Sequence, residues 1–285
     1  MIVDVNNSTN KPSSDIDPNP SHVSFSVIMA SHNRKYCIDQ AIESVLSQNY
    51  DKFELLIVDD CSTDGTDDHI KETYPGEIEK GKIRLIPCGK VGVSGARNIG
   101  LSLAKYDWIC YLDTDNKMMP SYFETYNRCI LENSGYQCFY AKIGLRTSGV
   151  AVGKPFSFPE LLLANFIDMG TFVHSKALYR ELGGHDAGLT RLGDWDQVIR
   201  YTALYTPYFI DTIVLDYNDV RGGDRISDNV GHEDNVQRIF AKNILINIDF
   251  LAKSLRNQES LWWAVKQLLR LLFHKIKNLL TGFFP

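Results

Sequence analysis

Two carboxylates that lie two residues apart are the first candidates for chemistry in this sequence. Asp113 and Asp115 directly follow the apolar run 109–112, which is short enough to be a buried strand. Ligands of an open α/β sheet bind beyond the carboxyl ends of its strands, so both side chains would face a binding site. Carboxylate oxygens suit Mg²⁺ or Mn²⁺ that is held together with substrate phosphates. The alternative is an Asx turn after a strand, because Asp and Asn are common turn formers.

Two further polar turns follow predicted strands earlier in the chain. Asp59 and Asp60 come after the strand 53–58, and Arg97 lies in the glycine-rich stretch 92–100 that opens a helix. Together with a metal at the first pair, these groups would satisfy the base or ribose and the phosphates of a nucleotide. The alternatives are that the two aspartates cap the next helix and that Arg97 is a surface residue paired with a carboxylate.

Two familiar nucleotide-binding motifs are missing from the sequence. The stretch 92–100 lacks the G-x-G-x-x-G spacing of the dinucleotide fingerprint, and no G-x-x-x-x-G-K-[ST] P-loop occurs. These absences narrow the ligand to a nucleotide that is held by side chains and a metal ion.

The elements that must position these groups alternate between strands and helices. The pattern predicts strands at 25–30, 53–58, 82–87 and 109–112, with helices over 38–46, around Ile70 and from Gly92. This spacing implies right-handed βαβ units in a mostly parallel sheet. A mixed region follows, with helices predicted at 120–131, 158–166 and 176–182 and strands at 136–143, 171–174 and 208–215. We expect that region to supply the acceptor side of the cleft.

Composition excludes several classes of protein. The 285 residues are 44% hydrophobic and 23% charged, which is typical of a globular protein, and the net charge of −5 argues against a nucleic-acid partner. The six cysteines form no C-x-x-C pair, so neither a zinc site nor a disulfide framework is predicted. No signal peptide precedes the first strand, and no uncharged apolar stretch reaches the roughly 18 residues that span a bilayer. We therefore expect a cytoplasmic, reduced protein.

Five blocks of the sequence resemble the family 2 glycosyltransferases. They are residues 26–34, 42–48, 56–66, 96–100 and 111–115, in the order that the family has them. The resemblance extends from about Phe25 to Ser227 and is stronger in the first half. It implies an inverting enzyme of the GT-A fold that uses a nucleotide-diphosphate sugar as donor and Mg²⁺ or Mn²⁺ as cofactor.

The resemblance also implies roles for individual residues. Asp60 would contact the nucleobase, while Ala30 and Ser31 would line the base and ribose pocket. Asp113 would face the ribose or the metal shell, and Asp115 would be the direct metal ligand. The full set implied to bind the nucleotide sugar is Ala30, Ser31, Asn33, Arg34, Asp60, Arg97, Asp113, Arg221 and Arg225.

The stretch 191–200 holds the candidate catalytic base. The family commonly has Glu-Asp-Trp here, and this chain has Gly193 in the Glu position, which removes a supporting carboxylate. Asp194 remains in the position of the proposed base, which must take a proton from the acceptor hydroxyl as that hydroxyl attacks. Asp194 could instead be an ordinary helix cap. Asp196 is the second choice, because it points to a different face of the helix.

The segment 217–227 resembles the mobile loop that closes over the donor in this family. Its glycines would permit a hinge, and Arg221 and Arg225 would offer bidentate contacts to phosphate. Many relatives have a histidine in this loop. His232 is a weak substitute for it, and we expect it and His185 to be structural.

The sequence from 231 onward is helical in pattern almost to its end. Leucines and isoleucines form one stripe, Lys and Arg lie opposite, and aromatic residues flank both ends. Six Lys or Arg against Glu259 give the part from Lys253 a charge of about +5, and hence the rest about −10. Residues 252–285 would therefore bind either a membrane surface, at the inner face of the plasma membrane, or protein, including a second subunit.

These expectations give one arrangement and three functional hypotheses. We predict a disordered leader at 1–22, a GT-A domain at 23–230 with a nucleotide half (23–116) and an acceptor half (117–230), and a helical extension at 231–285. The chain would transfer a sugar to an acceptor hydroxyl of a glycan or lipid-linked acceptor, in surface polysaccharide or glycan assembly. A non-catalytic scaffold of the same fold is the alternative that Gly193 favours. A nucleotidyltransferase would need a glycine-rich loop where this chain has 30–34.

Overall fold

A computed structural model describes residues 22–220, 238–239 and 242–243. Arg221, Arg225, His232 and the segment 252–285 lie outside these residues, as do nearly all of the predicted leader and extension. The domain division therefore stays a prediction. Among the described helices, none is long and apolar enough to cross a membrane.

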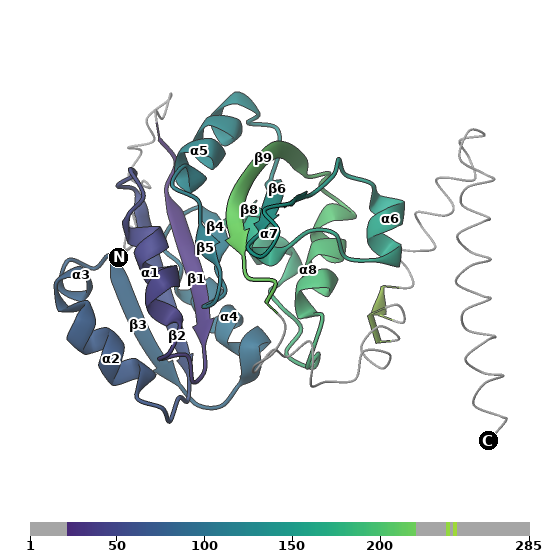
Figure 1. Ribbon diagram of the computed structural model, residues 1–285. Helices are drawn as coiled ribbons and strands as arrows, with labels where there is room; N and C mark the ends of the chain where they lie inside the picture. Colours follow the sequence, from purple (N-terminus) through teal and green to yellow (C-terminus); the bar gives the residue numbers. More distant parts are fainter. Residues whose placement is uncertain (1–21, 221–237, 240–241, 244–285) are drawn as a thin grey trace, which may run out of the picture.

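A sheet with the strand order β3-β2-β1-β4-β8-β6-β9-β5 forms the centre of the molecule (Figure 1). Its first four strands are parallel, as predicted: β1 (Phe25–Ser31), β2 (Phe53–Asp60), β3 (Ile83–Cys88) and β4 (Trp108–Tyr111). Beyond β4 the sheet is mixed, because β8 (Val173–Ser175) runs antiparallel to both β4 and β6 (Cys138–Leu145). The α/β architecture is confirmed, and the run of four adjacent parallel strands ends at β4.

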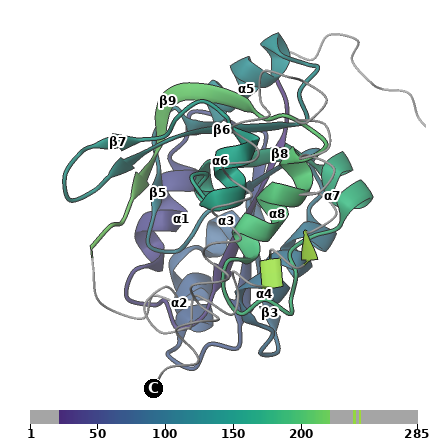
Figure 2. The ribbon, with the colours of Figure 1, turned by 90° about the vertical axis from the view of Figure 1, so that its right-hand side faces the viewer.

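The outer strands complete the mixed half of the sheet. The strand β9 (Tyr208–Tyr217) is parallel to β6 and antiparallel to β5 (Lys117–Met118). The short strand β7 (Ala151–Val152) pairs with β6, and the hairpin that they form projects from the body of the molecule (Figure 2).

Helices cover both faces of the sheet. They are α1 (Ile38–Leu46), α2 (Thr66–Thr73), α3 (Pro75–Glu79), α4 (Gly92–Leu103), α5 (Tyr122–Glu132), α6 (Phe158–Leu163), α7 (Lys176–Leu182) and α8 (Gly193–Thr202), with a 3₁₀ turn η1 (Met169–Thr171). The alternation of side chains along β1 separates two cores. Val27 and Met29 pack with α1 and α5, whereas Ile28 packs with α4, α7 and α8.

The close approach of α4 to β1 requires a glycine. A Cβ atom on Gly100 would lie 2.5 Å from Cγ2 of Ile28, so any larger side chain would push α4 away from the sheet. This contact fixes α4, which carries Arg97, against the strand that ends at Ser31.

Most of the predicted elements occur within a few residues of their expected bounds. The predicted helix at 120–131 begins at Tyr122, and the predicted strand at 171–174 begins at Val173 because η1 occupies the residues before it. Three short elements, α3, β5 and β7, were not predicted. With five, two and two residues, they are too short for a period of side chains to emerge.

Candidate functional site

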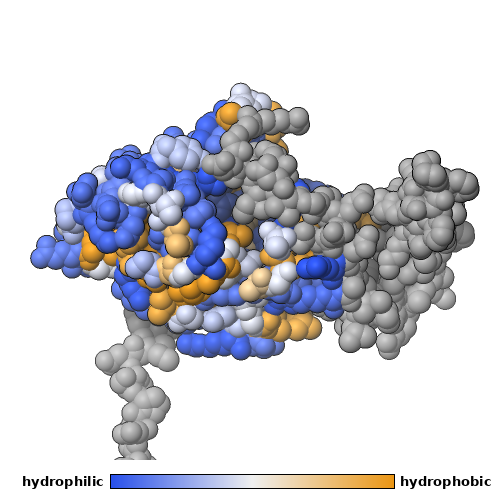
Figure 3. Space-filling view, turned by 90° about the horizontal axis from the view of Figure 1, so that it is seen from below, coloured by the Kyte–Doolittle hydropathy of each residue, from blue (hydrophilic) through white to orange (hydrophobic). Residues whose placement is uncertain are grey.

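The carboxyl ends of β1, β2 and β4 lie side by side at one edge of the sheet. Ser31 is in register with Asp59, and Ile28 is in register with Tyr111. The backbone N–H of Leu112 donates to the carbonyl of Ile28 at 3.1 Å, which continues the pairing toward Asp113. Figure 3 views the molecule from this end, where hydrophilic residues cover much of the described surface. The predicted polar turns therefore meet at one edge.

The two aspartates that end β2 are both engaged by nearby polar groups. Asp59 accepts the backbone N–H of Ser62 at 3.0 Å and its hydroxyl at 2.5 Å, which closes a local turn. The two oxygens of Asp60 accept the backbone N–H groups of Val91 (2.5 Å) and Gly92 (3.0 Å) at the start of α4. Asp60 thus caps α4 rather than the next helix in sequence. Its predicted contact with a nucleobase stays a prediction.

The turn after β1 is held by hydrogen bonds, and next to it lies one buried hydroxyl that no described residue bonds. Asn33 adopts a φ of 54° and is held by two hydrogen bonds at 2.8 Å, from its N–H to the Ser62 hydroxyl and from the Thr63 N–H to its side-chain oxygen. Arg34 donates to the hydroxyl of Tyr36 at 2.9 Å. The hydroxyl of Ser31 is buried, and no described residue hydrogen-bonds to it. Ser31 can therefore still bond to a ligand, as its predicted role requires.

An ion pair joins α4 to the end of β4. The guanidinium of Arg97 donates to Asp113 at 2.8 Å, and the Arg97 side chain is buried while 48% of the Asp113 side chain is exposed. Burial alone would lower the pKa of Arg97, but the negative charges of Asp113 and then Asp194 outweigh it and raise this pKa. Arg97 is not a surface residue, so that alternative is excluded. Asp194 thus contributes to the negative surroundings of the same guanidinium.

Asp113 and Asp115 provide two carboxylates beyond β4. Asp115 is half-buried. Burial first, and then the negative charge of Asp115, raise the pKa of Cys37 at the start of α1, against the lowering effects of Tyr36 and Arg34. No group of three or more His, Cys, Asp or Glu side chains in the described part of the chain could hold a metal alone. Mg²⁺ is commonly bound by one or two carboxylates together with substrate phosphates, so the pair fits a metal that arrives with its nucleotide.

The two aspartates at the start of α8 have different surroundings. Asp194 is partly exposed, and its negative charge contributes to the raised pKa of Arg97. Asp196 is fully buried and bonds to Arg200 (2.9 Å), Lys242 (2.9 Å) and Asn243 (3.2 Å). Because cations and an amide occupy both Asp196 oxygens, Asp196 is a structural residue. Asp194 is left as the candidate base.

The sequence did not single out Asp168, which lies before η1. Its side chain accepts the backbone N–H of Gly170 at 2.8 Å. Burial first, then the charge of Asp113 and with it that of Asp194, raise the pKa of Asp168 to about 7 against the opposing effects of the Gly170 N–H and Arg97. The Asp-x-Gly pattern is typical of a turn, and nothing local in the sequence distinguishes it from other capped turns.

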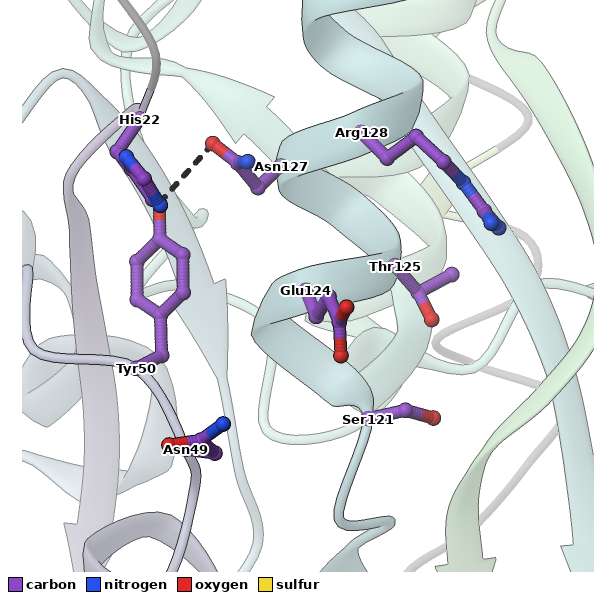
Figure 4. Close-up of a pocket in the computed structure, with 8 residues that line it drawn as sticks. All are labelled: His22, Asn49, Tyr50, Ser121, Glu124, Thr125, Asn127 and Arg128. Carbon is purple, nitrogen blue, oxygen red and sulfur yellow. Dashed lines mark hydrogen bonds between the residues drawn. The ribbon is translucent and has the colours of Figure 1, made fainter.

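A separate pocket of about 500 Å³ lies at the opposite edge of the sheet (Figure 4). His22 and Tyr50 precede β1 and β2, and α5 forms the other wall of this pocket with Glu124, Asn127 and Arg128. It contains none of the predicted site residues, so the candidate site is at the carboxyl edge.

Comparison with known proteins finds a matching family model and a matching fold. Residues 26–142 match the model of the family described as glycosyl transferase family 2. An uncharacterized glycosyltransferase of Haemophilus influenzae is 29% identical over 198 residues, which are 66% of this chain and 65% of that protein. The Escherichia coli protein named UDP-Glc:alpha-D-GlcNAc-diphosphoundecaprenol beta-1,3-glucosyltransferase WfgD is 32% identical over 49% of this chain and 53% of its own. The matched part of the chain thus spans less than two thirds of either relative.

A solved structure has the same fold. S. aureus TarS 1-349 in complex with UDP-GlcNAc aligns with a TM-score of 0.66 at 17% identity, over 80% of this chain and 66% of that chain. At this identity the likeness concerns the fold, and it confirms the predicted GT-A arrangement.

Proposed function

We propose that this chain, whose residues 26–142 match the model of glycosyl transferase family 2, transfers a sugar from a nucleotide-diphosphate sugar to an acceptor hydroxyl, with inversion. One observation carries the proposal. The buried Arg97 is paired with Asp113, and the negative charge of Asp194 also raises the pKa of Arg97. Charged groups from α4, from the turn after β4 and from α8 therefore act on one another at this site. A structural ion pair would not need the second carboxylate from the other half of the chain.

The donor side of the proposed site is the carboxyl edge of β1, β2 and β4. Asp113 and Asp115 would hold a divalent ion together with the diphosphate, and such an ion would offset the charge that develops on the departing diphosphate. The Ser31 hydroxyl and Asp60 would lie beside the ribose and base. Arg97 would keep Asp113 oriented through the 2.8 Å ion pair.

The acceptor side of the proposed site is the start of α8. The acceptor oxygen would form a bond to the anomeric carbon while the bond from that carbon to the diphosphate oxygen breaks. The proton of the acceptor hydroxyl would pass to the Asp194 carboxylate, and the nucleoside diphosphate would leave. Asp196 cannot perform this step because it is fully buried and both its oxygens are bonded.

We propose a glycan or lipid-linked acceptor in surface polysaccharide assembly, which the name of the Escherichia coli relative supports. The basic amphipathic sequence 252–285 would bring the chain to an anionic membrane surface or to a second subunit. Sedimentation with anionic vesicles, with and without these residues, separates the two, because only the membrane contact would require lipid.

A donor panel tests the proposed activity. Purified chain is incubated with UDP-, GDP- and dTDP-sugars and with Mg²⁺ or Mn²⁺, and release of nucleoside diphosphate is measured with and without lipid-linked or free glycan acceptors. We expect release with one donor class and loss of that release in Asp115→Ala. Full activity of Asp115→Ala would reject its role as metal ligand. Binding of a nucleoside diphosphate without release from any donor would instead support the non-catalytic scaffold.

A further inference from the structure

The side chain of Asn98 clamps a loop from the other half of the chain. Its amide nitrogen donates to the backbone carbonyl of His185 at 2.8 Å, and its amide oxygen accepts the backbone N–H of His185 at 2.8 Å. One side chain on α4 therefore satisfies both backbone groups of a residue 87 positions away. His185 lies in the loop that joins α7 to α8, just ahead of Asp194.

Two glycines show how closely that loop packs on α4. A Cβ atom on Gly184 would lie 2.2 Å from Oδ1 of Asn98, and one on Gly193 would lie 2.7 Å from Oγ of Ser94. Real Cβ atoms do not approach other atoms so closely, so a side chain at either position would displace the Asn98 amide or the Ser94 hydroxyl. The loop 184–193 is therefore held against α4 at two points.

The His185 side chain adds a third contact with the same region. The imidazole is 5% exposed and meets the ring of Tyr111 edge-on at 5.4 Å, and neither ring nitrogen has a hydrogen-bond partner among the described residues. Burial, and next the positive charge of Arg97, lower the pKa of His185 well below its usual value, so the ring is neutral. A neutral ring can lie beside Arg97 without competing for Asp113.

The helix α4 thus holds both sides of the proposed site through adjacent residues. Arg97 pairs with Asp113 on the donor side, and Asn98 clamps the loop that leads to Asp194 on the acceptor side. We propose that Asn98 is a positioning residue that fixes Asp194 at the required place across from Asp113. This inference rests on the proposed sugar transfer, because Asp194 needs a fixed position only if it acts on a bound acceptor.

The experiment compares two clamping asparagines. Asn127 on α5 is the matched control, because its Oδ1 accepts the Val23 N–H (2.9 Å) and the Tyr50 hydroxyl (3.0 Å) at the opposite edge of the sheet (Figure 4). In Asn98→Ala we expect kcat for transfer to fall by about ten- to a hundredfold, since small misplacements of a reacting group are costly. The KM for the donor should stay within about twofold of wild type, because the donor side is retained. Asn127→Ala should keep the wild-type kcat.

Amide hydrogen exchange provides a second readout that needs no activity. The His185 N–H donates to Asn98, so this amide and its neighbours in 184–193 should lose protection in Asn98→Ala and keep it in Asn127→Ala. Unchanged protection in Asn98→Ala, or an unchanged kcat, would overturn the inference while leaving the proposed function intact. An equal fall in kcat for both variants would also overturn it, because general destabilisation would then explain the loss. A wild-type chain that releases no diphosphate from any donor would overturn the proposed function, and the exchange result alone would then decide whether Asn98 holds the loop.

Discussion

Asp194 and Asp196 stand two residues apart in the first turn of α8, and their surroundings are opposite. Asp196 points inward, is fully buried, and is neutralised by Arg200 and Lys242. Asp194 is partly exposed, and its negative charge raises the pKa values of Arg97 and Asp168. An aspartate is therefore structural on one face of the helix, and an aspartate on the other face is available for chemistry.

The difference shows that the helix face on which a side chain lies decides whether it is structural or catalytic. Two steps along an α-helix turn a side chain by about 200°, so residues at i and i+2 cannot share a face. The inner face also meets the described segment that contains Lys242 and Asn243, which fasten to Asp196. A carboxylate that is surrounded in this way costs stability when removed, whereas one that faces a cleft costs activity.

The largest expected effect is on the activity of Asp194→Asn. Loss of a general base lowers the transfer rate by about a hundred- to ten-thousandfold, because no carboxylate then takes the proton of the attacking sugar hydroxyl. The unfolding free energy should change by less than about 0.5 kcal/mol, as is usual for a partly exposed side chain. Single-turnover transfer and urea unfolding measure the two quantities. Full activity would remove Asp194 from the role of base.

The complementary change, Asp196→Asn, should lower stability. Removing one partner of a buried charge cluster leaves the others uncompensated, so we expect a loss of about 3 kcal/mol in the free energy of unfolding. At a temperature where the variant is folded, its transfer rate should stay within about tenfold of wild type, since the group does not contact substrate. Equal effects of the two substitutions on both measurements would contradict the distinction between the two faces.

The sequence predicts a feature well when the residues that determine it are close together along the chain. The apolar run of 25–30 and the helical spacing of Trp195, Val198 and Ile199 are local patterns, and they predicted β1 and α8 correctly. The convergence of polar turns also followed from strand order, because parallel strands end at one edge.

Contacts between distant residues were beyond such patterns. The sequence does not say that Asp60 turns toward the N–H groups of Val91 and Gly92, because that depends on where α4 starts in space. Asp168 looks like any turn aspartate until Asp113 and Asp194 are folded beside it. The two residues of β5 become a strand only by pairing with β9, about a hundred positions away.

The position before Asp194 offers a finer test of how closely the outer face is packed. Gly193→Ala places a Cβ atom 2.7 Å from Oγ of Ser94, and overpacking of this kind costs about 2 kcal/mol. Ser94→Ala removes that oxygen, so the double variant should recover most of the lost stability. A double-mutant cycle by urea unfolding measures the coupling between the two sites. Additive losses would show that the helix tolerates a side chain at 193, and that the absence of a carboxylate there has no steric reason.

The smallest expected effect concerns Asp168, which shares the negative surroundings of Asp194. Its pKa of about 7 lies above that of an unfolded aspartate, so the folded chain binds the extra proton between about pH 4 and 7. This contribution to stability is present below pH 4 and is lost as the pH rises through 7. The side chain of Asn in Asp168→Asn does not ionise, so this variant keeps its stability as the pH rises. Its free energy of unfolding relative to wild type should therefore increase by about 1 kcal/mol between about pH 4 and 7, a value already reduced for the partial exposure of Asp168. Urea unfolding from pH 4 to 8 without divalent cations measures the difference. If the unfolding free energies of the two proteins changed with pH in parallel, the charges of Asp113 and Asp194 would not raise the pKa of Asp168. The electrostatic potential at the outer face of α8 would then be no more negative than at the inner face.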